Sequence, residues 1–419
     1  MEKEILKKIV IENIELIKEI DLFRRNINID NKANYIICGI RRCGKSFLQY
    51  QQIKSILKQN INEVIYINFE DERFVEFSTS DFDKIVECAF EIYHKKPIFF
   101  FDEIQNIEHW EKFARRLADQ AYQIFITGSN AKMLGKEVAT TLGGRYFIKD
   151  VFPLSFSEFL NFRKVKLEKN FSLSRQRFDL KKHFEFYMHF GGFPEMLKYQ
   201  NPREYLTSIF MKVFYGDLVT RNHIQNEQIL KLLIKKIAES VNNETSINRI
   251  KNLIKSTGIK IGNNTVTDYL NYLFDAYLIF PLLNYTSGFT ERETKKKYYF
   301  IDQGILNLFL TDQDTKLLEN IVFIELLRRY GQDIFYYKRK YEVDFYLPEE
   351  QMLIQVSYSI DNIETKEREI KALNAAMKEL NISHALILTH DEEEIIENEG
   401  KKIKVIPVWK WLLKDEYLG

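Results

Sequence analysis

Residues 39–46 read Gly-Ile-Arg-Arg-Cys-Gly-Lys-Ser and follow an apolar segment, 35–38, of the kind that forms a buried strand. The pattern G-x-x-x-x-G-K-S/T is typical of a loop whose backbone N–H groups surround phosphate oxygens at the start of a helix. Lys45 would reach the β- and γ-phosphates, and the Ser46 hydroxyl would bind Mg²⁺. We therefore predict that ATP binds against the following residues: Gly39, Ile40, Arg41, Arg42, Cys43, Gly44, Lys45, Ser46 and Phe47.

A second segment, from Pro97 to Glu103, is a continuous apolar run that ends in two acids, Asp102 and Glu103. Such a run predicts a buried parallel strand whose carboxylates lie at the carboxyl edge of a sheet, where ligands bind. There, Asp102 would hold Mg²⁺ through water, and Glu103 would orient and deprotonate the water that attacks the γ-phosphate. An ordinary strand followed by a solvated turn is the alternative. The two segments together predict an ATP-hydrolysing core.

Three further residues are candidates for roles in catalysis. Ser129 and Asn130 follow the predicted strand 123–127, where a polar side chain can sense the γ-phosphate or the attacking water; both residue types are also common helix caps. Arg145 comes after two glycines and just before another strand-like segment. It could serve as an arginine finger, in cis or donated to a neighbouring subunit of a homo-oligomer, or form a structural salt bridge.

The order of the predicted elements defines the fold class and the domains. Strand-like segments alternate with helical ones from residue 34 onward, which predicts an α/β fold with a parallel sheet covered on both faces, as in a P-loop NTPase core. Residues 1–33 have helical apolar spacing and would pack beside the nucleotide site. The predicted domains are this core, a helical lid, a winged helix-turn-helix and a further α/β unit, at 1–154, 155–225, 226–318 and 319–419.

The predicted lid contains one sharp break, Gly191-Gly192-Phe193-Pro194. Two glycines and a proline within four residues indicate a fixed, close approach of the backbone to another group. The chemistry of these residues leaves two alternatives open. The segment contacts the nucleotide, or it makes a tight turn between two helices.

Residues 226–318 have the spacing of a helix-turn-helix. Helical segments near 229–241 and 246–256 are followed by a turn, and Asn263 opens a third helix in the recognition position. Lysines at 251, 255 and 260, and the triplet at 295–297, would give a local basic surface, with the triplet in the position of a wing. Such a module binds DNA or packs against another protein.

The last hundred residues suggest a comparison with metal-dependent nucleases, in which two carboxylates on neighbouring strands hold Mg²⁺ and a lysine helps to activate water. Asp344 lies on one predicted strand, and Glu325 lies on the helix before it. The next strand offers Gln355 and Ser357 in place of the carboxylate and the lysine. These replacements argue against cleavage of phosphodiesters, so we expect a degenerate nuclease-like domain.

Composition limits the remaining function classes. The 419 residues contain 61 Lys and Arg and 60 Asp and Glu, so that binding to DNA must depend on local basic patches. The three cysteines and seven histidines have no metal-ligand spacing. The N-terminus carries acids and lacks an apolar signal core, and no segment approaches the length of a membrane span. We expect a cytoplasmic protein without a membrane partner.

Several motifs together resemble a bacterial and archaeal family of AAA+-type ATPases (the AAA_14 type) with a C-terminal domain of unknown function, of the DUF4143 type. The resemblance covers nearly the whole chain and is carried by the segments 39–46, 100–105, 127–130, 143–146, 153–160, 191–195 and 342–345. In related STAND-like and origin-recognition-like ATPases a Gly-x-Pro element of the lid touches adenine, which implies a nucleotide contact for Pro194. The resemblance also implies a C-terminal domain of the restriction-endonuclease type.

Three functions are compatible with these features. The first, which is the leading prediction, is an ATP-driven switch or motor that binds DNA through its winged helix. The second is an ATP-dependent nuclease that holds its metal with Asp344 and Glu325. The third is a signalling or scaffolding NTPase directed at proteins. Salt-dependent binding to DNA separates the first from the third, because phosphate contacts release counterions.

Overall fold

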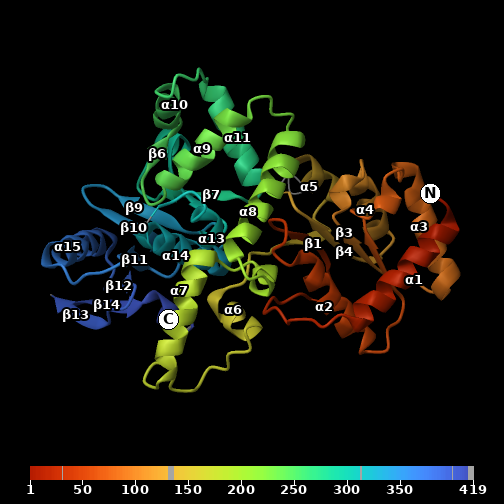
Figure 1. The fold of residues 1–419 in the computed structure, drawn as a ribbon, viewed down its shortest axis with the longest axis horizontal. Helices are drawn as coiled ribbons and strands as arrows, with labels where there is room; N and C mark the ends of the chain where they lie inside the picture. Colours follow the sequence, from red (N-terminus) through yellow and green to blue (C-terminus); the bar gives the residue numbers. More distant parts are fainter. Residues whose placement is uncertain (31, 131–135, 312–313, 399, 414–419) are drawn as a thin grey trace. The chain divides into compact units, whose positions relative to one another are not determined.

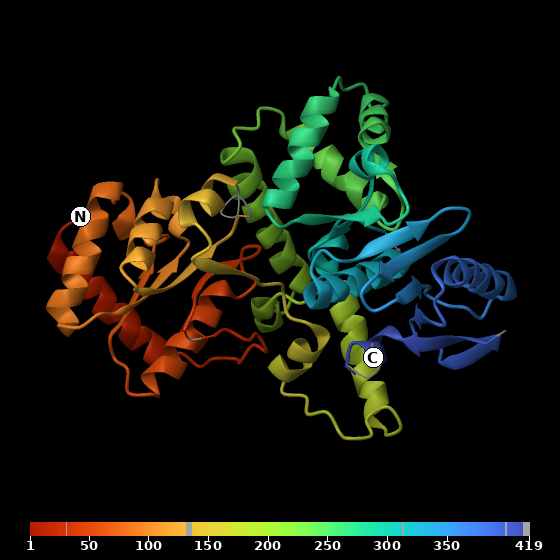
Figure 2. The ribbon, with the colours of Figure 1, turned by 180° about the vertical axis from the view of Figure 1, so that it is seen from behind.

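The computed structural model describes residues 1–30, 32–130, 136–311, 314–398 and 400–413. The chain forms two compact units (Figures 1 and 2). The first unit comprises residues 1–152 and 275–277, and the second comprises 153–274 and 278–419. Among the described residues, no helix is both long and apolar enough to cross a membrane.

The first unit is built on a five-stranded sheet in the order β2-β3-β4-β1-β5, and every neighbouring pair of strands is parallel. Its strands are short and almost entirely apolar at the centre of the sheet, as expected for strands that are covered on both faces. They are β1 (Asn34–Cys38), β2 (Val64–Asn68), β3 (Ile98–Asp102), β4 (Gln123–Gly128) and β5 (Tyr146–Asp150).

The helices of the first unit connect these strands. The chain crosses from β1 to β2 in one direction and from β2 to β5 in the other, so right-handed connections place α2 on one face and the later helices on the opposite face. Helix α1 packs against β2 through an apolar face that includes Leu6, Ile9 and Ile17. The helices are α1 (Lys3–Glu19), α2 (Lys45–Leu57), α3 (Phe82–Tyr93), α4 (Trp110–Asp119) and α5 (Lys136–Leu142).

The second unit begins with a helical region in which Gly191 and Gly192 have a structural role. Gly191 has a φ of 78°, and a Cβ added there would lie 2.0 Å from the Asp302 carboxylate. That carboxylate accepts hydrogen bonds from the backbone N–H groups of Gly192 (2.7 Å) and Gly304 (2.8 Å). The two glycines therefore allow the turn after α7 (Gln176–Phe190) to close on the segment before α13 (Gln303–Leu306).

The helical elements before the first strand of this unit are mostly amphipathic. A π-helix, η6, continues α8 without a break. The elements are α6 (Phe156–Phe162), α7 (Gln176–Phe190), η5 (Pro194–Lys198), α8 (Pro202–Lys212), η6 (Val213–Thr220) and α9 (Glu227–Glu239).

A short strand, two helices and an antiparallel hairpin follow α9. Strand β8 pairs with β7 on one side and with β6 on the other, both antiparallel. The elements are β6 (Thr245–Ser246), α10 (Ile247–Lys255), α11 (Asn263–Asp275), β7 (Ile279–Asn284), α12 (Phe289–Thr294) and β8 (Lys295–Phe300).

The remaining strands extend this hairpin into a nine-stranded sheet in the order β13-β14-β12-β11-β10-β9-β7-β8-β6. Helix α14 is buried along most of its length, and α15 packs on β10, β11 and β12. The elements are α13 (Gln303–Leu306), α14 (Asp314–Tyr330), β9 (Phe335–Lys338), β10 (Glu342–Leu347), β11 (Met352–Val356), α15 (Ile363–Leu380), β12 (His384–Thr389), β13 (Glu394–Asn398), β14 (Lys401–Pro407) and α16 (Val408–Trp411).

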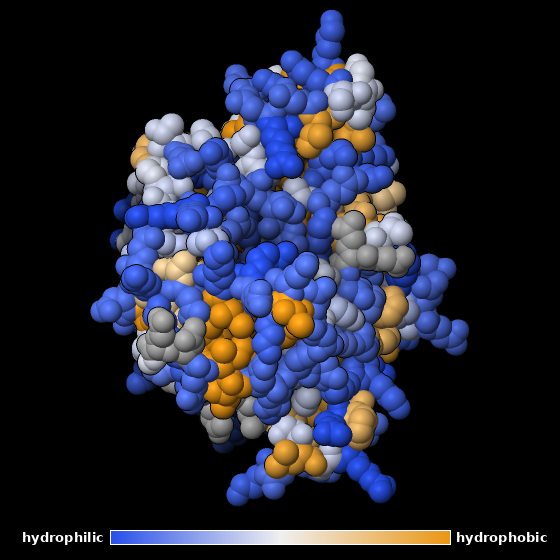
Figure 3. All heavy atoms as spheres, turned by 90° about the vertical axis from the view of Figure 1, so that its left-hand side faces the viewer, coloured by the Kyte–Doolittle hydropathy of each residue, from blue (hydrophilic) through white to orange (hydrophobic). Residues whose placement is uncertain are grey.

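The surface on the side of α15 is mostly hydrophilic, with small apolar patches between charged side chains (Figure 3). Exposed apolar residues of this unit include Ile363 at the start of α15 and Ile395 on β13. Isolated exposed apolar residues of this kind are ordinary on a protein surface.

The predicted α/β class with a parallel core sheet is confirmed. The strands predicted before the glycine-rich motif, before the two acids and at 123–127 form β1, β3 and β4. The division into four domains stays a prediction. The predicted boundary between 318 and 319 falls inside α14, and the nine-stranded sheet continues across it.

Candidate nucleotide-binding site

Three polar segments meet at the carboxyl edge of the five-stranded sheet. The loop 39–44 follows β1, Glu103 follows β3, and Ser129 and Asn130 follow β4. Strand β4 lies between β1 and β3, so all three segments leave the sheet side by side. In a parallel sheet this edge is where ligands bind.

The loop after β1 has an unusual backbone. Gly39, Arg42 and Gly44 have φ values of 155°, 64° and 103°, and left-handed residues of this kind are typical of loops that bind anions with backbone N–H groups. A Cβ on Gly39 would lie 2.2 Å from the backbone oxygen of Val151, so this position requires glycine. The Arg25 guanidinium fixes the loop from behind by donating to the Cys43 carbonyl at 2.9 Å.

Lys45 is buried and its ammonium group crosses the loop. Its Nζ donates to the carbonyl oxygens of Gly39 (3.1 Å) and Ile40 (3.3 Å) and lies 3.2 Å from Glu103 Oε1. Burial alone would favour the neutral amine, but the charges of Glu103 and its acidic neighbours together outweigh burial and raise the pKa of Lys45 above its usual value. Lys45 is therefore a buried cation that is partnered by an acid and two carbonyls.

Glu103 is held by both its backbone and its side chain. It has a φ of 50°, and its N–H donates to Thr127 Oγ1 at 2.9 Å. Gln105 Nε2 donates to Glu103 Oε2 at 2.5 Å. Although burial opposes ionisation, the Lys45 charge and the Gln105 hydrogen bond lower the pKa of Glu103. The carboxylate is thus charged and has a different partner on each oxygen.

Asp102 is almost fully buried and accepts several hydroxyl hydrogen bonds. Tyr66 donates to its Oδ2 at 2.8 Å, and Thr127 donates to its Oδ1. A hydrogen bond from Ser46 also favours the charged form, yet burial and the Glu103 charge raise the pKa of Asp102. The Ser46 hydroxyl thus lies within hydrogen-bonding reach of the Asp102 carboxylate.

This donor set suits Mg²⁺, which prefers oxygen ligands and keeps several waters. Two carboxylates face a single lysine, so a divalent cation would offset the remaining negative charge. No group of three or more His, Cys, Asp or Glu in the described part of the chain could hold a metal by itself. A Mg²⁺ ion at Ser46 and Asp102 would therefore take its other ligands from phosphates and water.

The other predicted site residues have different positions. Ser129 and Asn130 are buried at the same edge as Lys45, and Ser129 Oγ accepts from Gln105 Nε2 at 3.4 Å. Phe47 is partly exposed on the first turn of α2. Arg145 precedes β5, at the opposite, amino edge of the sheet, where its Nε contacts Asp119 at 2.5 Å. Within its own unit, Arg145 therefore makes a structural salt bridge.

Pro194 opens η5 in the second unit. The close approach that its two preceding glycines predicted is made to Asp302 and Leu154 of the same unit. The contact between Pro194 and adenine stays a prediction.

The two acids that the nuclease alternative requires in the C-terminal region, Glu325 and Asp344, have other partners. The Glu325 carboxylate pairs with Arg328 and Arg329, three and four residues later on α14. Asp344 is instead faced by Lys297 at 3.3 Å, and this fully buried lysine also contacts Glu342 at 2.9 Å. Gln355 Oε1 accepts from the Asp344 N–H. The Lys297 ammonium thus supplies positive charge beside the acid that would bind the metal in the nuclease alternative.

Sequence reasoning missed four residues that shape the site: Arg25, Tyr66, Gln105 and Thr127. Tyr66 and Thr127 are polar residues inside apolar strands, which is a signal that could have been used. Gln105 follows the acidic pair by two residues, and its position in a short helical turn was not predictable from spacing. Arg25 lies far from the loop in sequence and carried no signal.

Comparison with known families supports this description of the first unit. Residues 31–160 match the family model described as an AAA domain. Residues 181–340 match a domain of unknown function, DUF8612, so the expected DUF4143 type is not confirmed.

Full-length relatives extend the similarity to nearly the whole chain. The uncharacterized protein MJ1544 of Methanocaldococcus jannaschii is 39% identical over 99% of this chain and 96% of its own length. An uncharacterized protein of Haemophilus influenzae is 31% identical over 90% of this chain and 94% of its own. The chain therefore belongs to the AAA+-type P-loop ATPase family.

Among solved structures, the Walker-type ATPase PABY2304 of Pyrococcus abyssi overlaps 70% of this chain and 99% of its own, with a TM-score of 0.43 and 16% identity. The AMPPCP-bound DnaA of Aquifex aeolicus overlaps 64% and 88%, with a TM-score of 0.26 and 14% identity. Both TM-scores are too low to support a structural argument.

The close contact between Gly39 and the Val151 backbone can be tested by substitution. Replacing Gly39 by Ala should lower the free energy of unfolding of the first unit by about 1–3 kcal/mol, because the loop or the Val151 backbone must move. Urea denaturation measures the effect. Gly262→Ala is the control, since a Cβ there meets nothing within 4 Å. Equal stability of the two variants would contradict this role of Gly39.

Proposed function

We propose that this protein binds ATP at the carboxyl edge of its five-stranded sheet and hydrolyses it. The observation that carries the proposal is the convergence of Lys45, Asp102 and Glu103 on one buried site at that edge. The loop 39–44 would surround the phosphates with N–H groups, and α2 would direct its N-terminus at them. The family membership of the chain supports the same conclusion.

The chemistry follows from the partners of each side chain. Bound phosphates would compete with Glu103 for the Lys45 ammonium, because phosphate oxygens carry more negative charge than one carboxylate. Glu103 Oε1 would then be released to accept a proton from water. The water oxygen forms a bond to the γ-phosphorus, the bond from that phosphorus to the β–γ bridging oxygen breaks, and ADP leaves. A Mg²⁺ ion held by Ser46 and Asp102 would neutralise charge on the phosphate oxygens.

Four other residues take proposed supporting roles. Ser129 and Asn130 would sense the γ-phosphate or the attacking water, consistent with their burial beside Gln105. Arg145 could contribute only to a neighbouring subunit of a homo-oligomer, because it lies at the opposite edge of its own sheet. Pro194 would contact the adenine.

Lys45→Ala should abolish ATP binding and turnover, because the other buried cation that contacts the loop, Arg25, is held behind it by the carbonyls of Cys43 and Phe152 and does not replace the Lys45 charge beside Glu103. The measurement is Mg²⁺-dependent phosphate release together with binding of a fluorescent ATP analogue. Lys54→Ala is the matched control on the same helix, since the Lys54 ammonium donates to backbone carbonyls of Lys18 and Ile20. We expect Lys54→Ala to retain activity. Turnover by Lys45→Ala at the wild-type rate would refute the proposed site.

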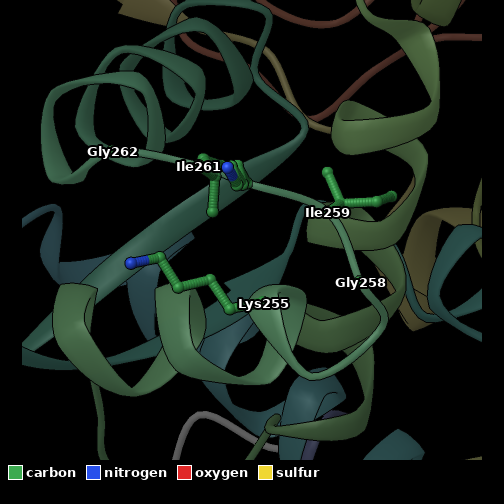
Figure 4. Close-up of a pocket in the computed structure, with 6 residues that line it drawn as sticks. Lys255, Gly258, Ile259, Ile261 and Gly262 are labelled. Carbon is green, nitrogen blue, oxygen red and sulfur yellow. The ribbon is translucent and has the colours of Figure 1, made fainter.

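We also propose that the segment from α9 to β8 binds DNA, so that the protein acts as an ATP-driven switch or motor on DNA. Its order of helices followed by an antiparallel hairpin is that of a winged helix. Between α10 and α11 lies an open hollow of about 620 Å³, lined by Lys255, Lys260 and the segment around Gly258 (Figure 4). Neither lysine has an acidic ion-pair partner among the described residues, so both could meet phosphates.

The lysine triplet at 295–297 contributes less positive charge to this surface than the sequence predicted. Lys295 pairs with Glu291 at 2.7 Å, and Lys296 pairs with Glu293 at 3.3 Å. Lys297 is fully buried among acidic side chains. The expected basic wing is therefore largely neutralised, and α10 with the following turn is the better candidate for phosphate contacts.

Replacing both Lys255 and Lys260 by Ala should weaken binding to duplex DNA by at least about 10-fold and reduce the salt slope by about 2, because each lysine that neutralises a phosphate contributes about one unit to that slope. Fluorescence anisotropy between 50 and 200 mM salt, roughly the range over which such contacts show, measures both quantities. The double variant Lys295→Ala/Lys296→Ala is the matched control and should bind almost as wild type. If the wild-type protein binds no DNA, the protein-directed switch becomes the better account.

The nuclease alternative receives no support from the C-terminal site. The residue expected as its second metal ligand, Glu325, is paired elsewhere, and Lys297 already compensates Asp344 and Glu342. We therefore propose a degenerate nuclease-like domain, which serves binding or assembly.

A further inference from the structure

We propose that Gln105 is a positioning residue for ATP hydrolysis, which acts by fixing one oxygen of the Glu103 carboxylate. This inference rests on the proposed ATPase function. Gln105 lies on the short turn η3 (Ile104–Asn106), directly after Glu103. Neither the sequence pattern nor the family match assigns it a role.

The two oxygens of Glu103 have different partners. Oε2 accepts from Gln105 Nε2 at 2.5 Å, whereas Oε1 lies 3.2 Å from the Lys45 ammonium. Only the second of these contacts is open to competition from phosphates, because Gln105 is neutral and belongs to the same turn as Glu103. When Lys45 moves to the phosphates, Oε1 becomes free and Oε2 stays fixed. The carboxylate would then be oriented with Oε1 as the atom that receives the proton.

Gln105 also connects Glu103 with the neighbouring strand. Its Nε2 lies 3.4 Å from Ser129 Oγ, directly after β4. One amide group therefore bridges the end of β3 and the end of β4. Through this bridge a change at Ser129 would alter the orientation of the Glu103 carboxylate.

The remaining atom of the Gln105 amide is an acceptor without a donor. Oε1 of Gln105 is buried and has no hydrogen-bond partner among the described residues. Leaving such a group unpaired costs free energy, and native proteins accept the cost mainly where function requires it. The Gln105 amide is therefore a polar group that the fold satisfies only on its donor side, toward Glu103 and Ser129.

Gln105→Met keeps the length of the side chain and removes the amide. We expect kcat to fall by about 100-fold, the scale that a small misplacement of a reacting group can cause, because the Glu103 carboxylate is no longer fixed. KM for ATP and the affinity for a fluorescent ATP analogue should change less than about 2-fold, because an interaction that acts only in the transition state leaves ground-state binding unchanged. Steady-state kinetics and equilibrium titration give the two quantities.

Asn106→Ala is the matched control. Asn106 carries the same type of side chain on the same turn, but its Nδ2 donates to the Phe69 carbonyl at 3.3 Å, away from Glu103. The Asn106→Ala variant should retain the wild-type kcat. An equal loss of kcat in both variants would show that the turn is merely structural and would overturn the proposal.

A double variant tests whether Gln105 acts through Glu103. In a Glu103→Gln background, Gln105→Met should cause no further loss, because residues that act as one unit are not additive. If Gln105→Met lowered kcat in the Glu103→Gln background by the same factor as in wild type, the proposal would be contradicted. If Gln105→Met unfolds at a lower temperature than wild type, Gln105→Asn, which shortens the reach of the amide by one methylene, should give the same split between kcat and KM.

These measurements distinguish a failure of the proposed role of Gln105 from a failure of the proposed ATPase function. If wild-type protein hydrolyses ATP and Gln105→Met does so equally fast, Gln105 has no positioning role. If wild-type protein does not hydrolyse ATP, the proposed function itself fails.

Discussion

The ion pair between Lys45 and Glu103 is the interaction on which the rest of the site depends. Both groups are buried, and a buried charge is costly unless it is paired and hydrogen-bonded. The loop 39–44 supplies carbonyls to the lysine, and Gln105 supplies an N–H to the acid. In the proposed function, a triphosphate would take the place of Glu103 as the partner of Lys45, and the released Glu103 carboxylate would accept a proton from water.

The parallel sheet makes this pairing possible. Lys45 and Glu103 are 58 positions apart in sequence, and they meet only because β1 and β3 end at the same edge on either side of β4. Backbone constraints then set the geometry: Gly39 permits close contact with the Val151 carbonyl, and the φ of 50° at Glu103 turns its side chain out of the strand. The second unit also contains a buried cation, Lys297. Its ammonium group contacts two acids, Glu342 and Asp344, so the protein itself compensates its charge.

The sequence predicted the strands and loops that carry strong local motifs. It did not predict which side chains of these elements contact one another. The motifs around Lys45 and Asp102 predicted both their strands and their shared edge, because strand–loop–helix patterns are local. The roles of Arg25 and Gln105 depend on side-chain directions that spacing does not encode. The Lys295–Lys297 triplet looked basic in sequence, yet its charge is cancelled by acids one helical turn away or on another strand. Glu325 and Asp344 were paired by analogy, whereas the arginines on α14 lie closer to Glu325.

The central claim is that ATP takes Lys45 from Glu103 and leaves Glu103 to accept the proton. The most direct test is a titration of ATP into wild-type and Glu103→Gln proteins with turnover followed in the same samples. We predict that Glu103→Gln binds ATP at least as tightly as wild type, because the competing carboxylate charge is gone, while turnover falls by about 100-fold or more, the scale expected for removal of a general base. Weaker binding of ATP by Glu103→Gln, or turnover at the wild-type rate, would contradict the account.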